Sequence, residues 1–189
     1  MADGQAWKGK KILLSAAAAA LLLCANVRVV YAARVDGQEV SGSFTGRQLA
    51  ETQRCAAAAA EEIARGQAAE PTLTRQGRLT LRAPSGDTAA LLDACLTAAD
   101  GVQAAWAVTV GGERAGIVTD PSALGEAVES ILAQGAVDGA VSAELSEEIQ
   151  LTRVFIPRGQ ADDLMDVARS IRERTLVVSH TADGTVRYG

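Results

Sequence analysis

The chain has 189 residues and a net charge of −5, with 14 Arg against 22 Asp and Glu from Ala33 onward, which makes 14 − 22 = −8. That acidic balance excludes the basic stripe of a nucleic-acid-binding protein. Aromatic residues make up only 3% of the chain, so stacking platforms for bases or sugars are scarce.

The first predicted element is an export segment. The three lysines of the chain lie between Lys8 and Lys11 and precede an uncharged apolar run from Ile12 to Ala25, the order of a signal sequence. This run suits a cleaved signal peptide better than a full membrane span of ~20 residues. However, the best small-residue cleavage site, Val30-Tyr31-Ala32, would remove the start of a predicted strand. We therefore expect residues 1–26 to form an uncleaved anchor with Lys8 in the cytoplasm and the bulk of the chain outside; secretion after cleavage is the alternative.

An internal repeat organises the rest of the chain. Tyr31–Val40 aligns with Trp106–Ala115, and Gly42 then pairs with Gly116 across a one-residue gap. Later, Leu91-Leu92-Asp93 pairs with Leu164-Met165-Asp166. The period of roughly 73 to 75 residues is longer than that of solenoid repeats. We expect two tandem domains, repeat unit 1 at residues 27–100 and repeat unit 2 at residues 101–173.

Repeat unit 1 is predicted to contain three strands and two helices. A strand over 27–35 leads through Asp36-Gly37, a dipeptide that favours a two-residue hairpin turn, into a return strand over 38–44. A helix then begins with the capping box Thr45-Gly46-Arg47-Gln48 and ends at Gly66. A third strand over 78–83 and a helix over 87–98 complete the unit.

Repeat unit 2 is predicted to have the same element order. Its first strand ends in Gly111-Gly112, and a return strand over 113–118 precedes a helix capped by Asp120, with Pro121 at its first position, that ends at Gly135. A strand over 149–156 and a helix over 160–171 follow. Residues 174–189 form a terminal hairpin around Asp183-Gly184, with the start of a further domain as an open alternative.

The predicted fold class is therefore α+β: an N-terminal hydrophobic helix followed by two tandem strand-strand-helix-strand-helix units with antiparallel sheets. An antiparallel sheet with helices on one face is the simplest way to bury the apolar stripes of these elements.

Two of the three cysteines lie in the exported part. A Cys55–Cys95 disulfide is allowed outside the cytoplasm. A small buried thiol explains Cys95 equally well, because it follows Leu91 at helical spacing. Both alternatives stay open.

The search for chemistry returns no catalytic, cofactor-binding or metal site, and no cofactor is predicted. His180 is the only histidine, too few for a zinc site, and no nucleophile elbow or phosphate loop is present. Asp162 and Asp166 could share a cation, but a solvated helix start explains them better. The residues singled out are the two disulfide candidates and a turn and repeat motif, which comprises Asp36, Gly37, Gly42, Gly111, Gly112 and Gly116.

The segment Ala105–Leu124 carries a pattern of valine, x, glycine, three residues, glycine, x, valine, followed by a helix. It resembles a unit that recurs in the N-terminal, membrane-proximal regions of cell-wall proteins of Gram-positive, clostridia-like bacteria. Tyr31–Phe44 is similar, with Ser41 inserted before Gly42, and the resemblance covers roughly residues 8 to 173. In that family a membrane segment and tandem copies precede a LysM or five-glycine-repeat domain and a lysostaphin-like zinc endopeptidase.

The resemblance implies a noncatalytic extracytoplasmic module of a membrane-anchored cell-envelope protein, the spacer or positioning region of a peptidoglycan hydrolase. The family's zinc ligands match no stretch here, so the resemblance implies that catalysis lies in a zinc peptidase beyond Gly189. The expected partners are the cytoplasmic membrane and peptidoglycan or envelope proteins. The alternative is a complete small extracytoplasmic binding or sensor protein with no hydrolase attached, and a stand-alone enzyme is the least favoured hypothesis.

Overall fold

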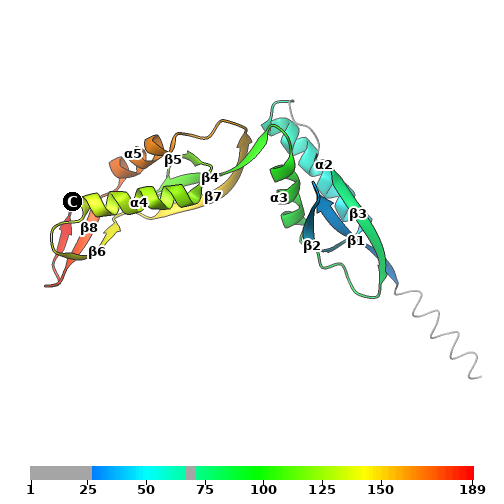
Figure 1. Cartoon of the computed structure of the whole chain (residues 1–189), viewed down its shortest axis with the longest axis horizontal. Helices are drawn as coiled ribbons and strands as arrows, with labels where there is room; N and C mark the ends of the chain where they lie inside the picture. Colours follow the sequence, from blue (N-terminus) through cyan, green and yellow to red (C-terminus); the bar gives the residue numbers. More distant parts are fainter. Residues whose placement is uncertain (1–26, 67–70) are drawn as a thin grey trace, which may run out of the picture. The chain divides into compact units, whose positions relative to one another are not determined.

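The computed structural model describes residues 27–66 and 71–189 (Figure 1). These residues divide into two compact units, the first made of residues 27–56 and 71–95 and the second of residues 57–66 and 96–189. The described ranges contain four helices and nine strands, arranged in three small antiparallel sheets.

The first unit begins with the strands β1 (Arg28–Val35) and β2 (Gln38–Phe44), followed by α2 (Gly46–Ile63), β3 (Leu73–Thr80) and α3 (Thr88–Ala98). The last residues of the two helices, 57–63 and 96–98, are assigned to the second unit. Strand β1 is central in the order β2-β1-β3. The largest fully buried side chains here, Phe44, Leu49 and Leu91, come from β2, α2 and α3. Each buried side chain of this size stabilises the unit by about 1.5–3 kcal/mol.

The β1–β2 connection is a two-residue turn. Val35 stands opposite Gln38, and the two residues between them, Asp36 and Gly37, have φ angles of 47° and 83°. Two consecutive positive φ angles are the mark of a type I′ turn, whose twist matches that of the flanking strands. The Asp36 amide also donates to the Thr72 carbonyl at 3.0 Å, which ties the turn to the start of β3.

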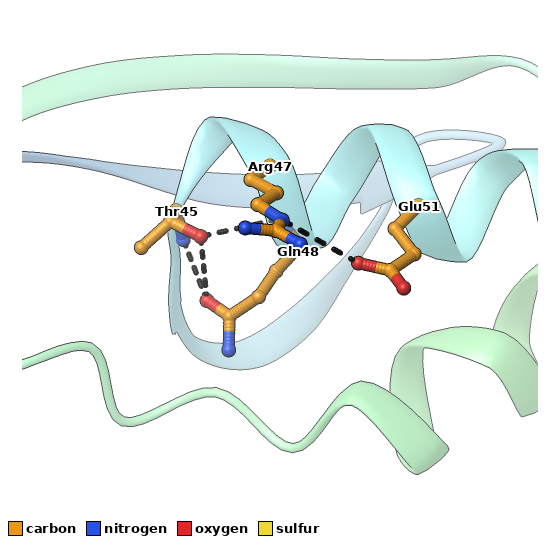
Figure 2. A network of polar contacts seen from close by, with 4 residues as sticks. All are labelled: Thr45, Arg47, Gln48 and Glu51. Carbon is orange, nitrogen blue, oxygen red and sulfur yellow. Dashed lines mark hydrogen bonds and ion pairs between the residues drawn. The ribbon is translucent and has the colours of Figure 1, made fainter.

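Helix α2 begins at the capping box that the sequence predicts (Figure 2). The Gln48 amide donates to Thr45 Oγ1 at 3.1 Å, and the Thr45 amide donates to Gln48 Oε1 at 2.8 Å. The helix ends at Ile63, and the turn that follows closes at Gly66, which has a φ of 81° and donates its amide to the Glu61 carbonyl at 2.9 Å. Both ends are therefore set by local hydrogen bonds to otherwise unpaired backbone groups.

The second unit contains two sheets and two helices. Its elements are β4 (Val102–Val110), β5 (Glu113–Val118), α4 (Pro121–Gly135), β6 (Ala140–Leu145), β7 (Ile149–Pro157), α5 (Leu164–Arg174), β8 (Val177–Thr181) and β9 (Val186–Tyr188). One sheet has the order β5-β4-β7 and the other has the order β6-β8-β9. A buried cluster joins β4 and β5 to both helices; it consists of Val108, Val110, Val118, Leu124, Val167 and Ile171.

The second unit repeats the local devices of the first. Gly111 and Gly112 occupy the β4–β5 turn with φ angles of 57° and 85°, and the Gly111 amide donates to the Glu148 carbonyl at the start of β7. Asp120 caps α4 by accepting from the Ser122 amide at 2.8 Å, and Pro121 takes the first helical position.

A β-bulge accounts for the one-residue gap in the repeat. In β5 one extra residue, Ala115, separates the partners of Val108 and Thr109. In β2 the bulge lies opposite Ala32 and holds Ser41, Gly42 and Ser43, so it is one residue larger. Ser41 thus enlarges an irregularity that both units possess, and the pairing on either side of it is kept.

The predicted architecture of an N-terminal hydrophobic helix followed by two equivalent strand-strand-helix-strand-helix units is wrong. The second unit has an additional strand, β6, which pairs with the C-terminal hairpin β8–β9 as a third sheet. Within residues 27–66 and 71–189, none of the helices has the length and hydropathy needed to cross a membrane. The predicted hydrophobic helix itself falls on residues 1–26, outside the described residues.

The third sheet packs closely against the end of α4. A Cβ atom added to Gly135, the last residue of α4, would lie 2.3 Å from Val177 Cγ2 in β8. Ser179, also in β8, is fully buried, and its hydroxyl accepts the Val137 amide at 3.2 Å. The C-terminal hairpin is therefore held in the second unit by burial and hydrogen bonding.

Candidate functional site

A groove lies between α2 and α3 of the first unit. Its volume is about 540 Å³. We call it the first groove; it is lined by Gln48, Glu51, Thr52 and Cys55 of α2 and by Thr88, Ala89 and Leu92 of α3. The exposed Glu51 carboxylate lies 3.9 Å from Arg47 on the same helix (Figure 2). Thr52 is buried and Leu92 is half-buried, and the carboxylate at the rim, Glu51, has an arginine partner.

A second groove, of about 300 Å³, lies between α4 and α5. It is lined by Ala127, Ser130, Ile131 and Gln134 of α4 and by Met165, Ala168, Arg169 and Arg172 of α5. Met165 is 69% exposed, and Arg169 pairs with Asp166 at 2.9 Å. The rim of the second groove therefore carries arginines, where the rim of the first carries a carboxylate.

The two grooves occupy corresponding places. Cys55 stands as many residues after the N-cap Thr45 as Ser130 stands after the N-cap Asp120. On the opposite wall, Leu92 and Ala168 stand at the same distance from Asp87 and Asp163, which accept the amides that begin α3 and α5. The two grooves therefore overlap in position, and each also has lining residues without a counterpart in the other. The sequence did not reveal these positions, which emerge once each helix is counted from its cap.

The glycines of the repeat motif allow the loop before the last helix of each unit to approach the sheet. In the first unit, the Gly86 amide donates to the Ser43 carbonyl at 2.9 Å, and a Cβ on Gly42 would lie 2.5 Å from Gly86 Cα. In the second unit, a Cβ on Gly116 would lie 2.6 Å from Val167 Cγ2 and 3.1 Å from Asp162 Oδ2. Gly42 and Gly116 thus allow close packing of the sheet against the segments that position α3 and α5.

The acidic residues considered for a cation site have other partners. Asp162 accepts the Ile117 amide at 2.7 Å, Asp163 caps α5 through the Met165 amide, and Asp166 pairs with Arg169. Across the described ranges, no group of three or more His, Cys, Asp or Glu residues is arranged to hold a metal ion. His180 lies in β8, with Nε2 at 3.2 Å from the Glu144 carboxylate. These contacts give each side chain a structural partner.

Arginine side chains lie over aromatic rings of β1, β4 and β7. The Arg75 guanidinium lies 5.4 Å from the centroid of the Tyr31 ring, and Arg153 lies 5.6 Å from the Trp106 ring and 5.7 Å from the Phe155 ring. Such cation–π contacts stabilise by about 0.5–1 kcal/mol at exposed sites.

Two side chains within the described ranges have clearly shifted pKa values. Burial raises the pKa of the Cys95 thiol, and the negative charge of Asp36 raises it further. Hydrogen bonds from the Thr181 and Thr185 side chains lower the pKa of Asp183 to about 2. A depressed carboxyl pKa contributes stability above the unfolded value, and this is lost as pH falls toward 2. Neither group lines a groove, and a raised thiol pKa makes Cys95 a poor nucleophile.

Cys55 and Cys95 are both free thiols in the structure, the first exposed and the second fully buried. The disulfide between them stays a prediction. The burial of Cys95 in the core beside Leu91 is what the alternative, a small buried thiol, requires.

Thiol titration separates these alternatives. With Cys24→Ser removing the third cysteine, Cys55 is expected to react rapidly with an aromatic disulfide reagent. Cys95 is expected to react only after unfolding, because it is buried and its pKa is raised. Cys55→Ser in the same background is the control and should lose the fast phase. If no thiol reacts, even after unfolding, until a reductant is added, the disulfide exists.

No protein family, no curated protein and no solved structure matches this chain.

Proposed function

We propose that these residues are a noncatalytic, extracytoplasmic spacer and positioning module of a membrane-anchored cell-envelope protein, of the kind that precedes a peptidoglycan metalloendopeptidase. The observation that carries the proposal is a repeated segment of hairpin and capped helix, residues 31–49 and 106–124, which follows a lysine-flanked apolar segment. The resemblance of Ala105–Leu124 to the membrane-proximal repeats of Gram-positive cell-wall proteins supports the same reading.

The two repeated segments share features that determine the backbone and differ in the side chains that line the grooves, and this supports a role as a spacer. Both keep the type I′ turn, the bulge glycine and the capped first helix, all of which determine the backbone. The groove linings differ, since Cys55 corresponds to Ser130 and Leu92 corresponds to Ala168. A unit retained for its fold keeps its turns and caps and lets its surface vary. A unit retained for one reaction keeps the reacting side chains.

Membrane topology is the first test. With Lys8, Lys10 and Lys11 on the cytoplasmic side, as the positive-inside rule requires, alkaline phosphatase fused after Gly189 is expected to be active. The chain is expected to stay in the membrane fraction at alkaline pH and to keep the peptide that contains Lys8. Replacing the three lysines by glutamate is the matched variant, and it should reduce phosphatase activity severalfold. A mature N-terminus at Ala33, found by mass spectrometry, would refute the anchor.

The link to a hydrolase has a separate test. We expect the reading frame to continue after Gly189 into a zinc peptidase domain. Purified chain of these 189 residues is expected to leave peptidoglycan intact in a zymogram. A stop codon immediately after Gly189 would refute the hydrolase part of the proposal and leave the anchored module standing.

A complete binding or sensor protein is the second candidate, and the pair of corresponding grooves favours it. In a pull-down with purified peptidoglycan or envelope proteins, this candidate predicts that filling a groove abolishes capture. Cys55→Trp would fill the first groove and Ala168→Trp the second, while Glu129→Trp on the exposed face of α4 is the control. Capture that is insensitive to both groove variants would contradict this second candidate.

A further inference from the structure

All of the large, exposed hydrophobic side chains described in the first unit gather where β1 starts and β3 ends. They are Val27, Val29, Leu79 and Leu81, with exposed fractions of 41%, 52%, 73% and 59%. Val29 and Leu79 are cross-strand partners and share one face of the sheet. Side chains along a strand alternate between its two faces. If this alternation continues one residue beyond β1 and β3, Val27 and Leu81 lie on the same face as Val29 and Leu79. Figure 1 shows the start of β1 beside the end of β3.

Basic side chains accompany this apolar group. Arg28, Arg78 and Arg82 are exposed at the same strand ends, where alternation places them on the face of the sheet opposite Val29 and Leu79. None of them makes an ion pair with another described residue. The segments 27–35 and 76–86 contain no Asp or Glu, although the chain as a whole is acidic. We call this surface the β1–β3 tip; it consists of Val27, Arg28, Val29, Arg78, Leu79, Leu81 and Arg82.

The position of the tip along the chain suggests what covers it. The apolar run ends at Ala25, and the tip begins at Val27. Two residues span at most about 7 Å, since an extended residue covers about 3.5 Å. The polar headgroup layer of one leaflet is roughly 5–8 Å thick. If Ile12–Ala25 lies in the bilayer, the tip is therefore held at headgroup level.

We propose that the β1–β3 tip docks on an anionic phospholipid surface, an inference that rests on the membrane anchoring of the proposed function. Val29 and Leu79, with their neighbours Val27 and Leu81, enter the boundary between headgroups and acyl chains. Arg28, Arg78 and Arg82 bind lipid phosphates. Exposed apolar residues with basic side chains beside them at the same strand ends are typical of interfacial membrane-binding surfaces, since long arginine side chains can reach lipid phosphates while their stems follow the apolar surface. Docking fixes the first unit on the membrane.

The test uses the full chain in liposomes of phosphatidylcholine and phosphatidylglycerol. An environment-sensitive fluorophore is attached at Leu81→Cys in a Cys24→Ser, Cys55→Ser background; Cys95 is buried. The control label is at Leu151→Cys, on the exposed strand β7 of the second unit. Brominated lipids are expected to quench the Leu81 label several times more strongly than the control label.

Two variants separate the apolar and basic contributions. Val29→Gln with Leu79→Gln should reduce quenching of the Leu81 label to the control level; both side chains are more than half exposed, so folding tolerates the change. Arg28→Gln, Arg78→Gln and Arg82→Gln should each lower the ratio of docked to undocked tip about fivefold in anionic vesicles. Neither set should change quenching at position 151.

The outcomes distinguish this inference from the function on which it rests. If the chain fails to float with the liposomes, the membrane anchor is refuted. If it floats and the Leu81 label is quenched no more than the control, docking of the tip is refuted and the anchor stands. The Leu81 label could instead become shielded as the protein-to-lipid ratio is raised, with no response to the brominated lipid. That result would show that a second copy of the chain covers the tip, and it would overturn the proposal.

Discussion

Replacing Gly42 by alanine is expected to lower the opening free energy of the first unit by about 3 kcal/mol. Gly42 has a φ of 100°, which costs a residue with a Cβ about 1–3 kcal/mol. The new Cβ would also lie 2.5 Å from Gly86 Cα, a backbone atom that cannot rotate away. Relief requires the loop before α3 to move off the sheet, at a further cost of about 1–3 kcal/mol.

Gly37→Ala is the matched control. Gly37 also has a positive φ, of 83°, but a Cβ placed there meets nothing within 4 Å. Only backbone strain remains, about 1–2 kcal/mol. Native-state hydrogen exchange measures both variants, because it reports the opening of each unit separately. Amides of β1 and α2 should lose about a hundredfold in protection with Gly42→Ala and about tenfold with Gly37→Ala. Equal losses would contradict the close approach at Gly42.

Ile171→Ala is expected to lower the stability of the second unit by about 3 kcal/mol, within the range for buried large-to-small changes. Ile171 is completely buried and belongs to the cluster that contains Val108 and Leu124. Truncation leaves a cavity between α5 and the β5-β4-β7 sheet. Urea unfolding followed by Trp106 fluorescence measures the loss, in a Trp7→Phe background that removes the second tryptophan.

Met165→Ala on the same helix is the control. Met165 is 69% exposed, so its truncation is expected to change stability by less than about 0.5 kcal/mol. The pair of variants tests which face of α5 enters the core. A larger loss with Met165→Ala than with Ile171→Ala would place the opposite face inward.

The sequence alignment of the repeat also paired the wrong residues of α3 and α5. Matching identical letters pairs Leu91-Leu92-Asp93 with Leu164-Met165-Asp166. In the structure, the buried positions Leu91 and Cys95 correspond instead to Val167 and Ile171, counted from the caps Asp87 and Asp163. An amphipathic helix can be shifted by about one turn and still show a similar apolar pattern. Only contact with the sheet decides between the two alignments.

The sequence-based prediction also misplaced or missed strands in polar segments. The third strand of the first unit was predicted over residues 78–83, but β3 runs from Leu73 to Thr80. Most of its side chains are exposed, so it lacks the alternation of apolar and polar residues that marks a half-buried strand. The short strand β6 was missed altogether. Its partner β8 lies more than thirty residues later, and nothing in Ala140–Leu145 indicates that pairing.

The sequence by itself determined the hairpin turns, the starts of α2 and α4 and the order of elements in the first unit. The last helix of the second unit was predicted from residue 160, but α5 starts at Leu164. Asp36-Gly37, the Thr45–Gln48 capping box and Asp120-Pro121 act through backbone angles and hydrogen bonds within four residues, so their effect can be read locally. The tertiary structure alone decided the third sheet, the inward face of α5, the two corresponding grooves and the gathering of Val29 and Leu79 with three arginines at the β1–β3 tip. Each of these depends on residues far apart in the chain, and their contacts exist only once sheets and helices have packed.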